Sequence, residues 1–188
     1  MTTQVQTPVN GVNVDQLVGT INAIKDNPDL ARFKFRTETE WIEGGHSRSV
    51  IQSFYGAGTE DTSRTGPFVL EGDEPPVLLG TNAGPNAVET VLHALASCLA
   101  VGFIYNAAAQ GIRVESLTFS LEGDLDLHGF LGLSDQIRPG YENIRVVYRV
   151  KADAPRERLE ALCDYVQKTS PVLDIIRDPV PVTVTLEG

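Results

Sequence analysis

The chain has 188 residues, of which 41% are hydrophobic and 21% charged, and its formal net charge is -10. These values are typical of a globular protein with one domain, or one domain with appendages, and they exclude an intrinsically disordered chain. The acidic balance, with no basic cluster along the sequence, argues against nucleic acid and anionic membranes as partners.

The sequence gives no sign of export or membrane insertion. Residues 1–7 lack the charged segment and apolar run of a signal peptide. The longest near-apolar stretch, residues 94–105, is too short to span a bilayer. We therefore expect a cytoplasmic protein in which Cys98 and Cys163 are free thiols. Neither cysteine belongs to a CxxC pair or a cysteine–histidine cluster, so we predict no metal site and no cofactor.

The first part of the chain predicts a helix followed by a hairpin. Apolar residues recur at helical spacing in 13–26 before Pro28, so we interpret residues 1–29 as an N-terminal helical extension of a domain spanning 30–188. Alternating residues in 33–39 and strand formers in 50–55 flank Gly44-Gly45, which predicts two paired strands. Residues 56–76 read as a loop with one short strand at 68–70.

The second part predicts a long helix and a sheet. The helix extends over about 86–110 and ends at Gly111. Strands grouped around helices, rather than alternating with them, indicate an α+β fold. The later elements are expected as strands at 112–126 and 142–151, a helix from Pro155, a short helix at 172–177 and a final strand at 180–186.

Cys98 lies near the middle of the long helix, where a thiol is either inert packing or a reactive group. At about 100° per residue, the helix face that carries Cys98 is almost entirely apolar. Burial there makes a thiol inert, because a reactive cysteine needs a nearby cation or a helix N-terminus. Arg36, Arg48 and His46, on the early strands and their hairpin, are the candidates for that cation. The residues alone leave both alternatives open.

A second face of the long helix is polar. Glu89, His93 and Ser97 are four residues apart and share this face, and Glu89 points away from Cys98. They either line a pocket in which His93 carries protons, or Glu89 forms a capping box with Asn86 and His93 is structural. Tyr105 is likewise either a pocket wall or a core residue.

Two segments of this sequence resemble a known family. The run 84–89, Gly-Pro-Asn-Ala-Val-Glu, followed by Ala-Ser-Cys-Leu-Ala at 96–100, resembles the start of the central helix of the OsmC/Ohr family of thiol peroxidases. The run 168–172, before a Val-Pro-Val-Thr strand, resembles the family's Cys-Pro-Val-Ser turn. The resemblance covers roughly residues 30–188 and implies antiparallel sheets wrapped around long central helices in an intertwined homodimer.

The resemblance also implies roles for individual residues. In the family's peroxidases one cysteine attacks the peroxide, a second resolves the sulfenic acid, and an arginine–glutamate pair activates the first thiol. Cys98 matches the attacking cysteine, whereas Ser170 occupies the resolving position. Val88 stands where the peroxidases have glutamate, and Glu89 matches the acidic residue of the less characterised OsmC-like branch.

These correspondences predict a hydroperoxide reductase in which Cys98 is catalytic and an external thiol replaces the missing internal partner. Arg36, Arg48 and Glu89 are then the candidates that assist Cys98. Cys163 is either a buried packing residue or a second thiol that approaches Cys98. The alternative is a non-catalytic family member that binds a small apolar ligand or is only structural. A cation within about 4–6 Å of the Cys98 sulfur would favour catalysis.

Overall fold

The structure is a computed structural model that describes residues 8–188. The chain divides into two compact units. The sheet unit is Asn13–Val91, and the core unit combines the segment ending at Val12 with Leu92–Gly188. The predicted boundary between residues 29 and 30 stays a prediction, and its residues 1–7 lie outside the described part.

The sheet unit begins with the predicted N-terminal helix, which is confirmed as α1 (Val14–Asp26). Asn13 caps this helix, because its side-chain oxygen accepts a hydrogen bond from the Gln16 backbone N–H. A 3₁₀ turn, η1 (Pro28–Ala31), follows directly. Its proline sets the backbone angle at the start of the turn and ends any continuation of α1.

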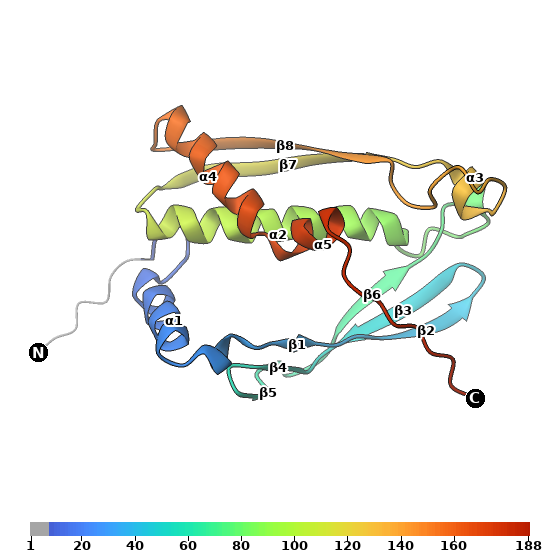
Figure 1. Ribbon diagram of the computed structural model, residues 1–188, viewed down its shortest axis with the longest axis horizontal. Helices are drawn as coiled ribbons and strands as arrows, with labels where there is room; N and C mark the ends of the chain where they lie inside the picture. Colours follow the sequence, from blue (N-terminus) through green and yellow to red (C-terminus); the bar gives the residue numbers. More distant parts are fainter. Residues whose placement is uncertain (1–7) are drawn as a thin grey trace, which may run out of the picture. The chain divides into compact units, whose positions relative to one another are not determined.

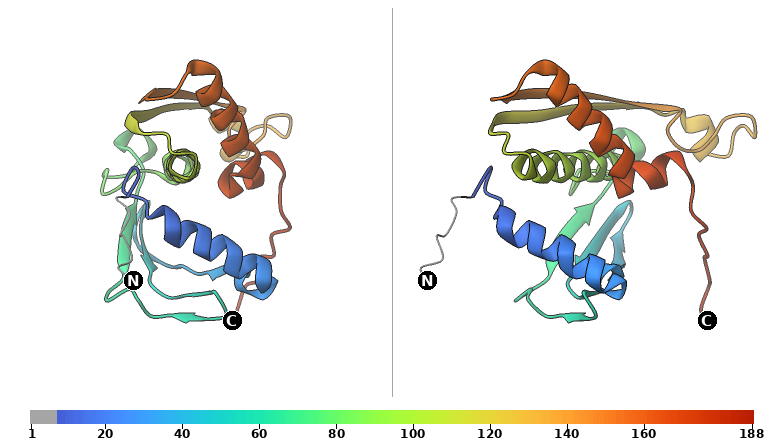
Figure 2. Two further views of the ribbon diagram at one scale, coloured as in Figure 1. Left: turned by 90° about the vertical axis from the view of Figure 1, so that its left-hand side faces the viewer. Right: turned by 60° about the vertical axis from the view of Figure 1, so that its left-hand side comes forward.

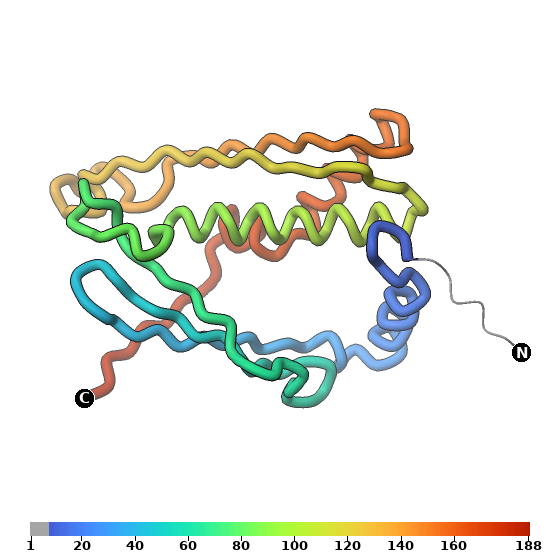
Figure 3. Tube along the Cα trace, turned by 180° about the vertical axis from the view of Figure 1, so that it is seen from behind, coloured from blue at the N-terminus to red at the C-terminus, as the bar shows by residue number. Residues whose placement is uncertain are grey.

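Two small antiparallel sheets complete the sheet unit (Figure 3). The predicted hairpin at Gly44-Gly45 is confirmed, with Gly44 at a positive φ of 52°. Its strands are β2 (Glu38–Glu43) and β3 (His46–Ile51) rather than 33–39 and 50–55. β6 (Phe68–Gly72) pairs with β3. The second sheet contains β1 (Lys34–Phe35), β4 (Phe54–Gly56) and β5 (Thr59–Asp61). β5 lies in a segment that was predicted to hold only one strand, near 68–70.

The long helix is confirmed as α2 (Ala87–Ala109) and is followed by Gly111, whose φ is 70°. Contrary to the expectation for residues 94–105, the full helix is long and apolar enough to cross a membrane, with a mean hydropathy of 1.8 and 17% of that window buried. Core helices of soluble proteins meet the same criterion. Leu95, Leu99 and Phe103 of α2 belong to a buried core.

That core belongs to the core unit. A long antiparallel hairpin of β7 (Val114–Asp124) and β8 (Asn143–Ala152) lies along α2, and α4 (Arg156–Thr169) passes beside both (Figures 1 and 2). Alternate residues of both strands face inward. A short helix, α3 (Leu127–Phe130), lies in the connection between these two strands. The buried cluster is Leu95, Leu99, Phe103, Ala107, Ile112, Leu162, Val166 and Leu173.

The end of the chain corrects one prediction. After α5 (Pro171–Arg177), residues 178–188 form no strand, although 180–186 alternate as a strand does. A strand needs a neighbour for its backbone groups, and none of the residues from 8 onward pairs with this segment. Val182, Val184 and Leu186 are consequently 79%, 90% and 96% exposed.

Candidate functional site

Cys98 meets Ser170 inside the core unit. The Cys98 Sγ atom lies 3.1 Å from the Ser170 Oγ atom, within hydrogen-bonding distance. Cys98 is half-buried in the middle of α2, and Ser170 is only 5% exposed at the junction of α4 and α5. The two positions that carry the family resemblance are therefore in direct contact, although 72 residues separate them along the chain.

The packing of α4 on α2 explains this contact. A Cβ atom added to Gly102 would lie 3.0 Å from Val166 Cγ1, so glycine allows the two helices to approach closely here. Four residues separate Cys98 from Gly102 on α2, and four separate Val166 from Ser170. From the Cys98–Ser170 contact to the Gly102–Val166 contact, the chain moves one turn forward on α2 and one turn back on α4. The two helices therefore pack antiparallel here.

Ser170 is well placed to donate a hydrogen bond to the sulfur. Its Oγ atom accepts a hydrogen bond from the Leu173 backbone N–H at 3.3 Å and so caps α5. That bond uses a lone pair and leaves the hydroxyl proton free. The proton can therefore point at Cys98 Sγ.

Cys163 lies on α4, seven residues before Ser170. Seven residues rise about 10 Å along a helix, so the backbone of Cys163 stands two turns from the serine that touches Cys98. Burial raises the pKa of the Cys163 thiol, and the neighbouring carboxylates of Asp164 and Glu160 raise it further. Both cysteines are free thiols. These features favour a protonated, weakly reactive Cys163, and its role as a second thiol stays a prediction.

Tyr148 was missed in the sequence. It lies on the inner face of β8, and its hydroxyl oxygen is buried with no hydrogen-bond partner among residues 8–188. Burial raises the pKa of Tyr148 to about 12, and the thiolate charges of Cys163 and Cys98 add to this effect. The signal was available, because Tyr148 is a polar residue at an inward position of an otherwise aliphatic strand.

Glu89, on the polar face of α2, takes part in the N-terminal cap of the helix. The Glu89 backbone N–H donates to Asn86 Oδ1 at 2.9 Å, and the Asn86 backbone N–H donates to Glu89 Oε2 at 3.0 Å. The predicted capping box is thus confirmed. His93 and Ser97 are exposed, and their side chains form no hydrogen bond within residues 8–188. Tyr105 is 46% exposed. Pocket roles for these three stay predictions.

The candidate cations all lie in the sheet unit, and all have carboxylate partners. Glu71 on β6 accepts hydrogen bonds from Arg48 Nε and His46 Nε2, each at 2.8 Å. Arg48 and His46 together lower the pKa of the Glu71 carboxyl. Arg36 forms a two-pronged pair with Glu60, at 2.9 and 2.8 Å. An approach of Arg36 or Arg48 to Cys98 stays a prediction.

Three basic residues line one cavity of the sheet unit. A cavity of about 300 Å³ in the sheet unit is lined by Arg32, Lys34 and Arg36, together with Phe33, Tyr55 and Glu60. Arg32 pairs with Asp29 at 3.2 Å, and Arg36 pairs with Glu60. Since two of the three cations are paired, the cluster gives little net positive charge.

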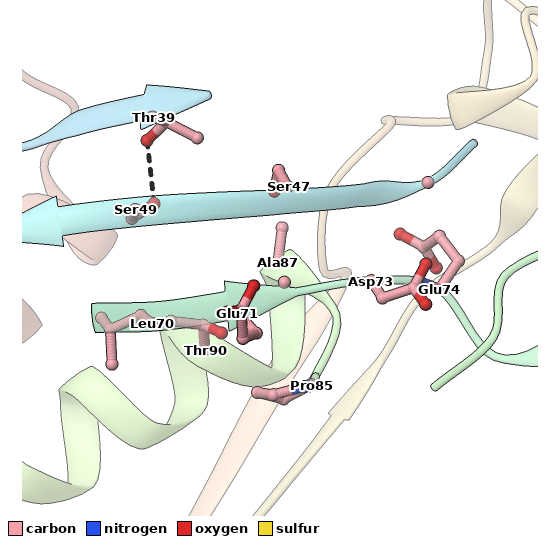
Figure 4. A pocket seen from close by; sticks show the side chains of 12 residues that line it. Thr39, Ser47, Ser49, Leu70, Glu71, Asp73, Glu74, Pro85, Ala87 and Thr90 are labelled. Atoms are coloured by element: carbon pink, nitrogen blue, oxygen red, sulfur yellow. Dashed lines mark hydrogen bonds between the residues drawn. The ribbon is translucent and has the colours of Figure 1, made fainter. Parts of the chain in front are cut away.

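A second cavity lies between the β3–β6 sheet and the first turn of α2 (Figure 4). Its volume is about 310 Å³, and Cys98 is not among the residues that line it. The hydroxyl residues Thr39, Ser47, Ser49 and Thr90 and the acidic residues Glu71, Asp73 and Glu74 line it. None of the residues His93, Ser97 and Tyr105 does.

Asp73, at one end of this cavity, organises the loop that leads into α2. It is 3% exposed, and its carboxylate accepts hydrogen bonds from the backbone N–H groups of Glu74, Thr81 and Ala83 and from the Thr81 hydroxyl. These donors lower the pKa of the Asp73 carboxyl strongly, those of Ala83 and Thr81 most. Asp73 therefore has a structural role that the sequence did not reveal.

Comparison with known proteins now decides the family. The OsmC-like protein family matches residues 80–185, which contain both Cys98 and Ser170. The chain belongs to the OsmC-like family. No curated protein matches the sequence.

Solved structures of OsmC-like proteins share the fold. An OsmC-like protein from Mycoplasma pneumoniae superposes with a TM-score of 0.59 at 14% identity, covering 78% of this chain and 89% of that one. An organic hydroperoxide resistance protein OsmC from Legionella pneumophila gives 0.53 at 16% identity, covering 77% and 90%. An OsmC-like protein of unknown function from Vibrio cholerae gives 0.51 at 14% identity, covering 75% and 92%.

For this OsmC-like chain, the structure brings together only part of the predicted site. Cys98 and Ser170 touch. Glu89 caps its own helix, and Arg36 and Arg48 pair with glutamates. Within residues 8–188, no three His, Cys, Asp or Glu side chains gather in a way that could hold a metal ion.

Proposed function

We propose that this OsmC-like protein is a hydroperoxide reductase with a single catalytic cysteine, Cys98. The observation that carries this proposal is the 3.1 Å contact between the Cys98 sulfur and the Ser170 hydroxyl. The hydroxyl gives the sulfur a hydrogen-bond donor in a half-buried, largely apolar place. A relative of the same fold is named an organic hydroperoxide resistance protein, which supports the same direction.

The reaction proceeds in two stages. The Cys98 thiolate attacks the distal oxygen of the hydroperoxide; an S–O bond forms, the O–O bond breaks, and the alkoxide takes a proton to leave as an alcohol. Cys98 is then a sulfenic acid. An external thiol attacks its sulfur, releasing water and forming a mixed disulfide, and a second external thiol frees Cys98 as the external disulfide leaves.

Ser170, Cys163 and a cation have different roles in the proposed reaction. Ser170 donates to the thiolate but cannot form a disulfide with it, so the oxidised cysteine must be recycled from outside. Cys163, whose raised pKa keeps it protonated, does not compete for the peroxide. We further propose that a cation from the sheet unit or from a second copy, Arg48 or Arg36, reaches the sulfur during the reaction.

A second copy of the chain is part of this proposal. Val91, Val101 and Tyr105 of α2 are 40%, 53% and 46% exposed, an apolar face that a partner helix would cover. The unpaired segment 178–188 exposes a row of valines to which a neighbouring strand would supply backbone partners. We propose a homodimer in the cytoplasm, without nucleic-acid or membrane partners, and size-exclusion chromatography with light scattering measures its mass directly.

The deciding experiment compares two cysteine variants. The protein is mixed with tert-butyl hydroperoxide and dithiothreitol, and peroxide consumption is followed. Cys98→Ser should abolish turnover, and the matched variant Cys163→Ser should retain it. Turnover that survives Cys98→Ser, or its absence from the unsubstituted protein, would contradict the proposal. In the second case the non-catalytic binding or structural role becomes the better reading.

A further inference from the structure

The sheet formed by β1, β4 and β5 has two faces of different chemistry. Residues 32–36 read Arg-Phe-Lys-Phe-Arg, and side chains of an extended chain alternate in direction, so the three basic residues share one face. The register extends this face across the sheet, because Lys34 lies opposite Tyr55 and Tyr55 lies opposite Glu60. The three strands lie side by side in Figure 1. These cations, the phenol ring and the carboxylate line the cavity of about 300 Å³ in the sheet unit.

Three phenylalanines hold β1 in place from the other face. The rings of Phe33, Phe35 and Phe54 pack together, with centroids 5.9, 6.2 and 5.5 Å apart. A Cβ atom added to Gly56 would lie 2.3 Å from Phe33 Cε1, so the Phe33 ring lies directly on the backbone of β4. β1 itself has only two residues. Aromatic packing therefore positions its basic face, and Phe33 also lines the cavity.

The cations of the cavity keep N–H groups that no acceptor among residues 8–188 uses. Arg36 bonds to Glu60 through both Nη atoms, which leaves its Nε–H. Arg32 pairs with Asp29 through Nε, which leaves its two Nη groups. Lys34 forms no hydrogen bond or ion pair in this part of the chain, although its charge helps that of Arg36 to lower the pKa of the Glu60 carboxyl. Three cations and two carboxylates leave one positive charge.

The charge, shape and size of the cavity limit what it can bind. One excess positive charge matches a monoanion, and Glu60 repels a second negative charge. Glu60 also shows that the wall recognises a carboxylate, because the guanidinium of Arg36 holds it by two hydrogen bonds. The rings of Phe33 and Tyr55 offer an aromatic body something to pack against. A cavity of about 300 Å³ is at the lower end for ligand sites, so the molecule is small.

We propose that this cavity binds a small aromatic carboxylate. The carboxylate of the ligand accepts hydrogen bonds from the Lys34 ammonium and from the unused N–H groups of Arg32 and Arg36. Its ring packs against Tyr55 and Phe33, while Glu60 stays paired with Arg36. The inference goes beyond the proposed function and does not depend on it, because no cysteine takes part in this binding.

The experiment titrates sodium benzoate into full-length protein labelled with ¹⁵N and follows the backbone amide shifts of residues 32–36 and 54–60. We expect saturable shifts with a dissociation constant of about 1 mM, a value within reach of so small a ligand. Acetate carries the charge without the ring, benzyl alcohol carries the ring without the charge, and inorganic phosphate carries more charge. All three should bind at least about tenfold more weakly, because each lacks one of the features that the cavity matches.

Two lysine variants locate the binding. Lys34→Gln should weaken benzoate binding about tenfold, because it removes a charged donor. Lys25→Gln is the matched control, since it makes the same charge change on α1, outside the cavity, and should leave the affinity unchanged. Cys98→Ser should also bind benzoate normally, which separates this site from the proposed reaction.

Saturable shifts that Lys34→Gln weakens and Lys25→Gln does not would support the inference. Four results would each overturn it: no saturation by benzoate, equal binding of acetate, benzyl alcohol or phosphate, full affinity in Lys34→Gln, or lost affinity in Cys98→Ser. None of these results bears on peroxide turnover, so the proposed function is tested separately.

Discussion

The surroundings of Cys98 in the core unit and of Asp73 in the sheet unit are built on opposite principles. Cys98 is half-buried in α2 and meets the neutral hydroxyl of Ser170. The sheet unit instead concentrates charge, with Arg48 and His46 on Glu71 and with Asp73 fixed by four donors. The comparison teaches that the contact of the candidate nucleophile within its own unit is a neutral one, whereas the charged groups of the sheet unit pair with one another or with backbone N–H groups.

The largest expected difference between the sheet unit and the core unit is the stability lost when a glycine is replaced by alanine. A Cβ atom at Gly80 would lie 1.8 Å from the Glu74 carbonyl oxygen, whereas at Gly102 it would meet the Val166 methyl group at 3.0 Å. We expect Gly80→Ala to cost about 4 kcal/mol or more, because backbone must move. Gly102→Ala should cost about 1 to 2 kcal/mol, because a side chain can shift. Urea unfolding measures both, and equal losses would contradict the contrast.

Asp73 tests whether charge organises the loop. Asp73→Asn removes the carboxylate that three backbone N–H groups and a hydroxyl share, so the urea midpoint should fall by about 1 M. In the unfolded chain the pKa of Asp73 is about 4. In the folded protein it is lower, because the carboxylate accepts hydrogen bonds. Its contribution is therefore complete above about pH 4 and is lost as the pH falls through the folded value. Unfolding between pH 3 and pH 7 should show a weaker pH dependence in Asp73→Asn than in the unsubstituted protein.

Ser170 tests whether the neutral contact governs the thiol. Ser170→Ala removes the donor to Cys98 and the cap of α5, so stability should fall by about 1 kcal/mol. The rate at which iodoacetamide alkylates Cys98 between pH 5 and pH 9 should also fall.

Ser170→Cys supplies the complementary result. It places a sulfur where an oxygen lies 3.1 Å from Cys98 Sγ, so mild oxidation should join the two cysteines. Intact mass and thiol titration detect this disulfide. Two thiols that stay free under diamide would show that the contact is not maintained in solution.

The smallest expected loss of stability comes from the capping box of Asn86 and Glu89 at the start of α2. Asn86→Ala removes the side-chain half of the capping box and should cost about 1 kcal/mol or less, measured by thermal unfolding. Peroxide turnover should be unchanged, because Glu89 serves the helix rather than Cys98. A large loss of turnover in Asn86→Ala or in Glu89→Gln would restore Glu89 as a catalytic candidate.

The sequence predicted those parts of the fold that local pattern determines. Helical periodicity placed α1 and α2 within a residue or two, and Gly44-Gly45 located the β2–β3 hairpin. The segment 180–186 alternates as a strand does, but pairing depends on a neighbour that no local pattern encodes. β5 was missed because three residues in a loop rich in glycine and aspartate give almost no periodicity.

The site was predictable only in part, for a related reason. Family resemblance located Cys98 and Ser170, and the structure explains their contact through the small residue Gly102 beneath Val166. Asp73 looked like an ordinary acidic loop residue, because its donors are mostly backbone N–H groups with no sequence signature. Partners of buried polar groups are set by tertiary packing, which spacing along the chain does not record.

The exposed end of the chain is a potential site of aggregation. Val182-Thr183-Val184-Thr185-Leu186 combines high β-propensity with no charge, the composition of segments that stack into cross-β fibrils. Pro181 lies at its start, and a proline blocks the backbone ladder on which such stacking depends. Heating should therefore promote aggregation through this segment, and Pro181→Ala should accelerate it.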